Sequence, residues 1–363
     1  MNILTIGSDR NLFESDTAVR TRVVEYGKLF DSMSIIVFTT RSPKYKVSHM
    51  APNVTVYPTR SLNRLFYVWD AILLGRKIKT FDVVSAQDPF ESGIVAWVIA
   101  KISESKLHIQ VHTDLFDPNF KKESFLNKIR VLLAKFLLPK AGGIRVVSER
   151  IKRTLVGRGI RENKITVLPI YVDVEKIANQ PVKTDLKEKY RDRYIILMAS
   201  RLTVEKNIQL AIRAIQGLFK SPEITKNLLL LIVGDGPEKI HLEEMVMQYG
   251  LTQHVMFESW TSDLISYLKT CDVFLLTSNY EGYGMTLVEA AASGALIVSS
   301  NVGISSEIVP PGHLFTVGDN LDLENKLTEA IIGRLDAKGK NLSLSKHYSW
   351  EEYLLEYKKS CSL

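Results

Sequence analysis

The sequence predicts an α/β protein with two parallel-sheet domains in tandem. Short apolar runs of strand length alternate with amphipathic helical segments along the whole chain, which is typical of layered α/β folds. The 363 residues, 45% of them hydrophobic, are enough for two domains of ordinary size. Around 169–185, Pro169, Pro181 and a run of charges interrupt the periodicity. We therefore expect two Rossmann-like domains facing across a cleft, with ligands bound at the carboxyl ends of the strands.

The first domain is expected to span residues 1–175. Its apolar runs predict strands at Ile3–Gly7, Ser34–Phe38, Val54–Tyr57, Val83–Ala86, His108–His112 and Gly143–Val147. Helical periodicity covers residues 17–31, 63–78, 90–104, 121–138 and 148–158. Alternation of the two patterns predicts helical crossover connections, which join parallel strands.

The second domain is expected to span residues 176–345. Strands are predicted at Tyr194–Ala199, Leu228–Val233, Val255–Glu258, Val273–Thr277 and Ala295–Ser299, and helices at 206–219, 238–249, 262–270, 285–293 and 323–334. A last helix lies within 346–363, where Ser349 and Glu352 have the spacing of a capping box. We expect this helix to cross back to the first domain.

Charge is unevenly distributed between the two halves. Residues 1–180 carry 28 lysines and arginines against 17 acidic residues, whereas residues 181–363 carry 19 against 23. The basic first half predicts an anionic partner, for which a phosphate-bearing substrate or an anionic membrane surface fits at least as well as nucleic acid. Because the basic residues are not interleaved with aromatics in a known binding module, no nucleic-acid partner is expected.

The composition favours a cytoplasmic protein. The two cysteines, Cys271 and Cys361, make no disulfide framework. The chain opens on the strand-like MNILTIG without the basic region of a signal peptide, and no apolar stretch reaches the roughly 18 residues that span a bilayer. No Asp-x-Asp or Cys-x-x-Cys motif is present, so we expect neither a metal nor a cofactor.

The segment 271–307 is the most informative about function. An apolar run precedes the turn Gly282-Tyr283-Gly284, and an apolar helix follows it. Free N–H groups at the start of such a helix bind anions. Glu281 lies in the turn and Glu289 on the second turn of the helix, so a phosphorylated sugar donor could use the amides for phosphate and the carboxylates for hydroxyls. Alternatively, both glutamates only complement the helix dipole.

Two cations follow the first strand of the second half. Arginine can fork onto two phosphate oxygens and lysine adds a point charge, so Arg201 and Lys206 are expected to bracket a diphosphate. The alternative is a solvated basic pair with Glu205 as partner. Gly234 follows the next strand, where a missing side chain lets a ligand approach closely, although a plain strand-to-helix turn fits equally well.

His112 stands at the end of a predicted strand in the first half. A histidine there could hydrogen-bond a sugar hydroxyl or transfer a proton, although a single histidine at a strand end is more often structural.

The segment 121–140 predicts an amphipathic helix with a basic face. One side of the helix carries Phe125, Ile129, Leu132, Leu133, Phe136 and Leu137. Lysines and an arginine are distributed over its other sides. This pattern suits a helix on an anionic bilayer surface, and it equally suits a core helix with a solvated basic face.

Residues 105–363 resemble the retaining GT-B glycosyltransferases of family 4. The resemblance is carried by DVFLLTSNYEGYGMTLVEAAASGALIVSSNVG, SRLTVEKN, LLIVGDGPE and VLPIYVDVEK, in the family's order. It implies a nucleotide sugar as co-substrate, held mainly by the C-terminal domain, and transfer with retention of anomeric configuration, usually without a metal.

The resemblance also implies roles for individual residues. Arg201 and Lys206 would bind the donor diphosphate, and His112 would lie near the transferred sugar. Glu281 would contact the donor hexose and Glu289 the ribose. The backbone of the turn and helix start would hold sugar and phosphate, which involves Gly282, Tyr283, Gly284, Met285, Thr286 and Leu287.

Three departures from the family pattern stand out. The loop after the first strand carries only Gly7, where many members have paired glycines. Asp9, Arg10 or Arg22 could take part of the role that this glycine-rich loop has in the family. Ile170-Tyr171 replaces a frequent Asn-Gly pair, and Ile304 replaces the second glycine after Val302.

The sequence thus predicts a hexosyltransferase that uses a GDP- or UDP-sugar. The expected acceptor is a glycan or polyprenyl-linked glycan, at the inner face of the cell membrane. An epimerase or phosphorylase on the same fold, or a non-catalytic nucleotide-sugar-binding subunit, are the alternatives. A dehydrogenase has little support because no Gly-x-Gly-x-x-Gly opens either domain.

Overall fold

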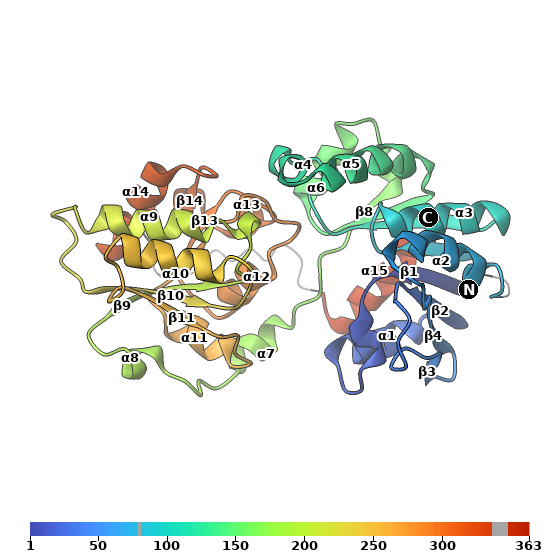
Figure 1. The fold of residues 1–363 in the computed structure, drawn as a ribbon, viewed down its shortest axis with the longest axis horizontal. Helices are drawn as coiled ribbons and strands as arrows, with labels where there is room; N and C mark the ends of the chain where they lie inside the picture. Colours follow the sequence, from blue (N-terminus) through green and yellow to red (C-terminus); the bar gives the residue numbers. More distant parts are fainter. Residues whose placement is uncertain (79–80, 336–347, 363) are drawn as a thin grey trace. The chain divides into compact units, whose positions relative to one another are not determined.

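The computed structural model describes residues 1–78, 81–335 and 348–362, which form two compact α/β units (Figure 1). The first unit comprises Met1–Pro169 together with Tyr348–Leu363, and the second comprises Ile170–His347. Each unit is built around one largely parallel sheet. The predicted fold class of two Rossmann-like domains is confirmed.

The sheet of the first unit has the strand order β3-β4-β2-β1-β5-β6-β7-β8. All neighbours pair in parallel except β3, which runs antiparallel to β4. The strands are β1 (Asn2–Gly7), β2 (Ser32–Val37), β3 (Ser48–Ala51), β4 (Val54–Pro58), β5 (Val83–Ala86), β6 (Lys106–Val111), β7 (Gly143–Val146) and β8 (Ile165–Val167). The six predicted strands of this half are all present, while the short edge strands β3 and β8 were not predicted.

The helices of the first unit cover both faces of its sheet. They are α1 (Ala18–Gly27), α2 (Tyr67–Gly75), α3 (Glu91–Ile102), α4 (Pro118–Glu123), α5 (Phe125–Leu137), α6 (Glu149–Val156) and α15 (Trp350–Ser362). Short 3₁₀ turns precede or follow them at η1 (Arg10–Phe13), η2 (Arg64–Phe66), η3 (Leu138–Lys140) and η4 (Glu162–Lys164). Helix α3 packs on β5 and β1 between α2 and α5, and α15 packs on β7 and β5.

One predicted helix is wrong in its boundaries. The sequence predicts a single helix over 121–138, but the structure has two, α4 and α5, which meet at Ser124. Ser124 is extended, and its hydroxyl accepts a hydrogen bond from Asn127 N at 3.1 Å, so it is the N-cap of α5. A serine that caps a new helix competes with continuation of the previous one.

The terminal helix α15 belongs to the first unit, as predicted. Ser349 and Glu352 form the expected capping box, with Glu352 N donating to Ser349 Oγ at 3.1 Å and Ser349 N to Glu352 Oε2 at 2.9 Å. Tyr353 and Tyr357 are buried against the sheet, and the Tyr357 ring stacks on Tyr26 of α1 at 4.6 Å.

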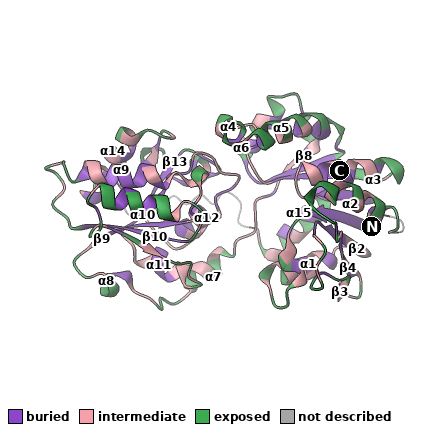
Figure 2. Ribbon diagram, in the orientation of Figure 1, coloured by how far each residue is buried: buried purple, intermediate pink, exposed green. Residues whose placement is uncertain are grey.

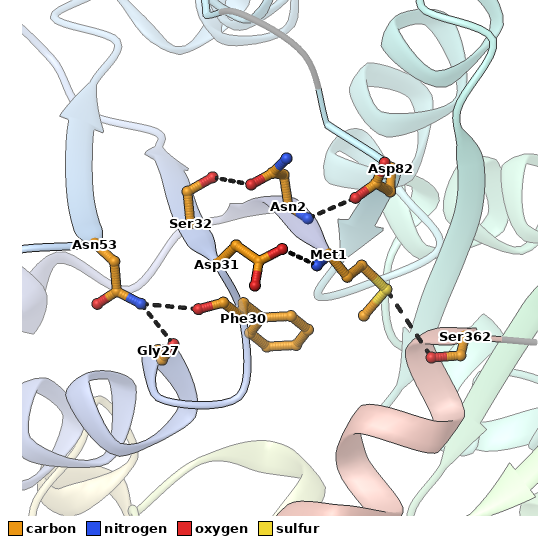
Figure 3. A network of polar contacts seen from close by, with 9 residues as sticks. All are labelled: Met1, Asn2, Gly27, Phe30, Asp31, Ser32, Asn53, Asp82 and Ser362. Carbon is orange, nitrogen blue, oxygen red and sulfur yellow. Dashed lines mark hydrogen bonds and ion pairs between the residues drawn. The ribbon is translucent and has the colours of Figure 1, made fainter.

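Polar contacts also fix the amino-terminal end of this sheet (Figure 3). Asn2 N donates to Asp82 before β5 at 2.7 Å, and Asn2 Oδ1 accepts from Ser32 of β2 at 2.7 Å. The terminal ammonium of Met1 pairs with Asp31. Because β1 is a central strand, these contacts join it to both neighbouring strands.

The sheet of the second unit is fully parallel, with the order β11-β10-β9-β12-β13-β14. Its strands are β9 (Tyr194–Ala199), β10 (Leu228–Val233), β11 (Val255–Glu258), β12 (Val273–Leu276), β13 (Ile297–Ser300) and β14 (Leu314–Phe315). The five predicted strands are confirmed. Strand β10 reads LLLLIV and is buried throughout, as expected where helices cover both faces of a parallel sheet (Figure 2).

The helices of the second unit include all those predicted and three short ones that were not, α7, α8 and α13. They are α7 (Val174–Asn179), α8 (Leu186–Lys189), α9 (Ile208–Leu218), α10 (Lys239–Gln248), α11 (Leu264–Thr270), α12 (Met285–Ala292), α13 (Ser305–Ile308) and α14 (Asn320–Ile331), with 3₁₀ turns η5 (Val204–Lys206) and η6 (Pro311–His313). Helices α9 and α14 pack together over an apolar core. Across the described ranges of both units, no helix has the length and apolarity needed to span a membrane.

Candidate functional site

The candidate site of the second unit lies where two neighbouring strands end. Strands β9 and β12 pair directly, so their carboxyl ends and the loops that follow are adjacent. Thr277 Oγ1 donates to the carbonyl of Lys206 at 2.9 Å, and Asn279 N donates to the carbonyl of Glu205 at 2.8 Å. These bonds fasten the loop after β12 to the η5 turn after β9.

An ion pair joins the two loops at this edge of the sheet. Lys206 Nζ lies 2.5 Å from Glu281 Oε1, and Ser278 Oγ donates to the same oxygen at 2.7 Å. The side chains of Lys206 and Glu281 retain only 17% and 12% of their exposure, so solvent screens the pair weakly. The sequence placed both residues at the site but did not predict that they contact each other.

Arg201 is not part of this pair. Its side chain is 77% exposed, and its Nη2 lies 3.4 Å from Glu205 Oε1. Glu205 is the partner expected if Arg201 is only a solvated basic residue. The contact between them is long and exposed, so it contributes little to stability. The guanidinium therefore keeps most of its donors available to a ligand.

The turn 282–284 leads into α12 through a left-handed residue. Gly284 has φ 97° and is the N-cap of the helix, which has no side-chain cap. A helix start without a capping side chain leaves its first N–H groups free for an anion. Met285 and Thr286, in this first turn, are half-buried, whereas Tyr283 and Leu287 are buried.

The loop after β13 packs against the turn 282–284. Gly303 has φ 53°, and a Cβ at this position would lie 2.7 Å from Tyr283 O and 2.9 Å from the Cβ of Glu281. Ile304 N donates to Tyr283 O at 3.1 Å. The side chain of Ile304, which stands where the family often has glycine, is buried. Only glycine at 303 allows this backbone to press against the Glu281 turn.

Glu289 lies on the second turn of α12 itself and is half-buried. Burial raises the pKa of its carboxyl above the ordinary value of 4.5. Within the described part of the chain, its carboxylate has no hydrogen-bond or ion-pair partner. A partly desolvated carboxylate without a partner is suited to accept hydrogen bonds from ligand hydroxyls.

Gly234 ends β10 beside the end of β9. Its φ is 143°, and a Cβ there would lie 2.0 Å from Ser200 O. Gly234 N donates to Glu258 O at 2.9 Å. The close approach of two strand ends is thus sufficient to explain this glycine, and a contact of Gly234 with a donor stays a prediction.

His112 lies in the first unit, directly after β6. Burial, together with the nearby charges of Arg145 and Arg22, lowers the pKa of its ring to about 3. The imidazole is therefore neutral at physiological pH. A neutral ring can donate one hydrogen bond and accept another, but it carries no positive charge.

The glycine-poor loop after β1 uses two of its polar residues for structure. Asp9 Oδ1 accepts from Asn11 N at 3.0 Å and caps η1. Arg10 Nε donates to Phe38 O at 3.1 Å, and its Nη2 donates to Tyr67 Oη at 2.9 Å. Of the three residues considered for a ligand role, Arg22 alone is exposed on α1 with no such contact among the described residues.

The sequence did not predict a role for Ser278 or for the hydrogen-bonded pair Asn207 and Asn279. Ser278 holds Glu281, and Asn207 Nδ2 donates to Asn279 Oδ1 at 3.0 Å. For Ser278 and Asn279 the available signal was their position in the loop directly after β12, whereas Asn207 follows η5 and gave no such signal. In residues 1–78, 81–335 and 348–362, no three His, Cys, Asp or Glu side chains gather as a metal site would require.

Two family models match this chain in succession. The model of Glycosyltransferase Family 4 matches residues 29–176, and that of glycosyl transferases group 1 matches residues 181–343. The chain is a GT-B glycosyltransferase of family 4. The turn and ion pair described above lie within the second match, and His112 lies within the first.

Two curated relatives act on lipids or lipid-linked sugars. The α-monoglucosyldiacylglycerol synthase of Streptococcus pneumoniae is 23% identical, over 90% of this chain and 77% of its own. The UDP-Gal:α-D-GlcNAc-diphosphoundecaprenol α-1,3-galactosyltransferase of Escherichia coli is 32% identical over a shorter stretch, 38% of this chain and 37% of its own.

The fold is shared with solved glycosyltransferase structures. The Anabaena protein HepE, solved with UDP and glucose, superimposes with a TM-score of 0.71 at 18% identity, covering 100% of this chain and 98% of its own. At this level of identity the likeness supports the fold of the glycosyltransferase and no individual contact.

Gly303→Ala is expected to damage the site because the added methyl group would clash with backbone and strain a left-handed residue. We expect a lower melting temperature and weaker donor binding, measured by differential scanning fluorimetry and calorimetric titration. Gly312→Ala is the matched control, since a Cβ there meets nothing within 4 Å. Equal behaviour of the two variants would show that the Glu281 turn does not need this support.

Lys206→Met and Glu281→Gln are each expected to lower the free energy of unfolding, because each leaves a poorly solvated partner unpaired. The expected cost is about 1–3 kcal/mol, or about 2–4 °C in melting temperature per kcal/mol for a domain of this size. The double variant should lose less than the sum of the two single losses. Strictly additive losses, measured by thermal denaturation, would contradict a direct pair.

Glu289→Gln is expected to stabilise the unliganded protein at pH 7 and not at pH 4. The folded-state pKa of Glu289 lies above its unfolded value of 4.5. Folding is therefore penalised increasingly as the pH rises from the unfolded pKa to the raised folded pKa, the full penalty applies above it, and glutamine removes the penalty. Melting curves between pH 4 and pH 8 test this, with the exposed Glu244→Gln as control. A shift of equal size at every pH would disprove the linkage.

Proposed function

We propose that this glycosyltransferase moves a hexose from a GDP- or UDP-sugar to a glycan or polyprenyl-linked glycan, with retention of configuration and without a metal. The observation that carries the proposal is the Lys206–Glu281 pair beside the uncapped start of α12. It combines a cation, a carboxylate and free N–H groups at one edge of the sheet. Diphosphate and sugar hydroxyls need these three kinds of group.

The diphosphate of the donor is assigned to the cations and the helix start. In the transition state the leaving diphosphate gains negative charge, so groups that hold it lower the barrier. Lys206 supplies a fixed charge close to the turn, and the exposed guanidinium of Arg201 can fork onto two phosphate oxygens. These two cations would take the part that a divalent ion plays in metal-dependent transferases.

The sugar and the ribose are assigned to carboxylates. Glu281 would accept from hexose hydroxyls while Ser278 and Lys206 keep its orientation. Glu289, without a partner among the described residues, would accept from the ribose hydroxyls. The neutral ring of His112 would hydrogen-bond the transferred sugar, since burial prevents it from acting as a cation at neutral pH.

The relatives support the proposed acceptor and location. One relative makes a glucosylated diacylglycerol and another extends a diphosphoundecaprenol-linked sugar, which supports a lipid-linked acceptor. The latter uses UDP-Gal and HepE was solved with UDP, which supports a UDP-sugar as donor. We place the enzyme peripherally at the cytoplasmic face of the membrane.

The decisive experiment is a transfer assay with a panel of nucleotide sugars and polyprenyl-diphosphate-linked acceptors. The anomeric signal of the product in proton NMR should match that of the donor, and EDTA should leave the rate unchanged. Lys206→Met should lower kcat by about 10²–10³-fold, as for loss of one preorganised group that stabilises developing charge.

Four results would contradict the proposal. An inverted product would exclude the retaining mechanism, and loss of activity in EDTA would exclude metal independence. Conversion of the donor sugar in the absence of any acceptor would identify an epimerase instead. Tight donor binding without turnover for any acceptor would favour a binding subunit.

A further inference from the structure

Helix α5 of the first unit is apolar on two opposite sides. Its inner side is buried and consists of Asn127, Val131, Ala134 and Leu137. The opposite side exposes large apolar residues, with Phe125 exposed by 75%, Leu132 by 63%, Phe136 by 50% and Ile129 by 39%. These four recur at the i, i+4, i+7, i+11 spacing of one helical face. We call Phe125, Ile129, Leu132 and Phe136 the α5 outer face.

This orientation favours the membrane interpretation of the sequence over the core-helix interpretation. A core helix with a solvated basic side would turn its largest apolar residues inward. The structure instead buries Ala134 and Asn127 together with Val131 and Leu137, and leaves the two phenylalanines outside. Scattered surface apolar residues are ordinary, but a contiguous row along one helix face marks an interaction site.

The α5 outer face is bordered by basic residues. Lys128 and Lys135 are exposed on the same helix, and Lys140 lies over the Phe136 ring at 4.4 Å. Lys121 and Lys122 are exposed at the end of α4. Between residues 121 and 140 the sole acidic residue is Glu123. Apolar side chains between lysines match the interface of an anionic bilayer, where rings enter the acyl boundary and ammonium groups stay with the headgroups.

A hollow of about 400 Å³ opens beside this face. Leu138, Pro139 and Ile160 supply apolar walls, and Lys135 and Arg158 bring two cations to it. The Arg158 guanidinium stacks on the Phe116 ring at 4.1 Å, which orients its donors. Two cations beside apolar walls suit a phosphate that is attached to an aliphatic group.

We propose that the α5 outer face docks on an anionic phospholipid bilayer and that the adjoining hollow receives the phosphate of one lipid. This deepens the proposed function, on which it rests, by bringing the enzyme to the surface where a lipid-linked acceptor lies. Arg158 and Lys135 hold the phosphate, and the rings of Phe125 and Phe136 enter the interface. Charge complementarity favours this occupant over a symmetric contact with the same face of a second copy, which carries the same lysines.

Vesicle co-sedimentation of the full chain tests the docking surface. The protein should bind vesicles with 30% phosphatidylglycerol, bind pure phosphatidylcholine at least tenfold more weakly, and dissociate in high salt. Lys128→Gln should weaken binding about fivefold, since one lysine near an anionic surface contributes about that factor. Leu132→Ser with Phe136→Ser should abolish binding. Absence of binding by the unaltered protein at low salt would overturn the proposal.

A matched control uses two apolar residues of the second unit that are at least as exposed as Leu132 and Phe136. Ile240 and Leu321 are exposed by 72% and 67%, and the variant Ile240→Ser with Leu321→Ser should bind vesicles as the unaltered protein does. Equal loss in both double variants would refute a specific face. Self-association that disappears with Leu132→Ser and Phe136→Ser, seen by sedimentation equilibrium without lipid, would identify a second copy as the occupant and overturn the membrane assignment.

The hollow is tested separately with a short-chain phosphatidic acid below its micellar concentration. Arg158→Gln should weaken its binding at least tenfold while circular dichroism shows an intact fold. If inorganic phosphate binds as tightly as the lipid, the apolar walls play no part and the lipid assignment fails. Donor binding by calorimetry separates the two proposals, because vesicle binding without donor binding would refute the proposed function alone.

Discussion

The candidate site depends on the ion pair between Lys206 and Glu281. The two residues are separated by a long stretch of sequence, yet β9 and β12 are neighbours in the sheet, so their loops meet. Side-chain and backbone hydrogen bonds from Thr277 and Asn279 fix the distance between the loops. A charged pair of low exposure is costly to desolvate, so folding rather than ligand binding bears most of that cost. Little reorganisation then remains for a ligand to impose, which is how preorganised charge favours a transition state.

The same arrangement explains why glycine recurs around Glu281. The turn must pass close to the loop after β13 on one side and enter α12 on the other. Gly303 provides the first approach and Gly284 the left-handed entry to the helix. At position 304 this chain does not need the second glycine of the family pattern. The backbone N–H of Ile304 donates to the carbonyl of Tyr283, and the isoleucine side chain is buried. Backbone geometry, more than side-chain identity, thus positions the carboxylate.

Much of this could be predicted from the sequence, and the limits have physical causes. Strands such as β10 are apolar along their length, so local pattern identified them, whereas β14 is too short to carry a pattern. Motif order placed Lys206 and Glu281 at strand ends, but strand adjacency is a long-range property that no local pattern encodes. Helix α5 was ambiguous because both of its sides are apolar, and only packing against α3 decides which one is buried.

The protonation of His112 depends on residues far away in the sequence. Strand β6 turns His108 and Gln110 toward Arg145 of β7, and Arg145 Nη1 donates to Gln110 Oε1 at 2.9 Å. Arg145 is buried, and its hydrogen-bond acceptors are neutral, including the hydroxyl of Tyr353 at 2.7 Å on the returning helix α15. Because no carboxylate among them neutralises the guanidinium, its field adds to burial in lowering the pKa of both histidines to about 3. Helix α15 therefore does more than complete the first unit, since the Tyr353 hydroxyl bonds a buried charge that adds to the effect of burial on the pKa of His112.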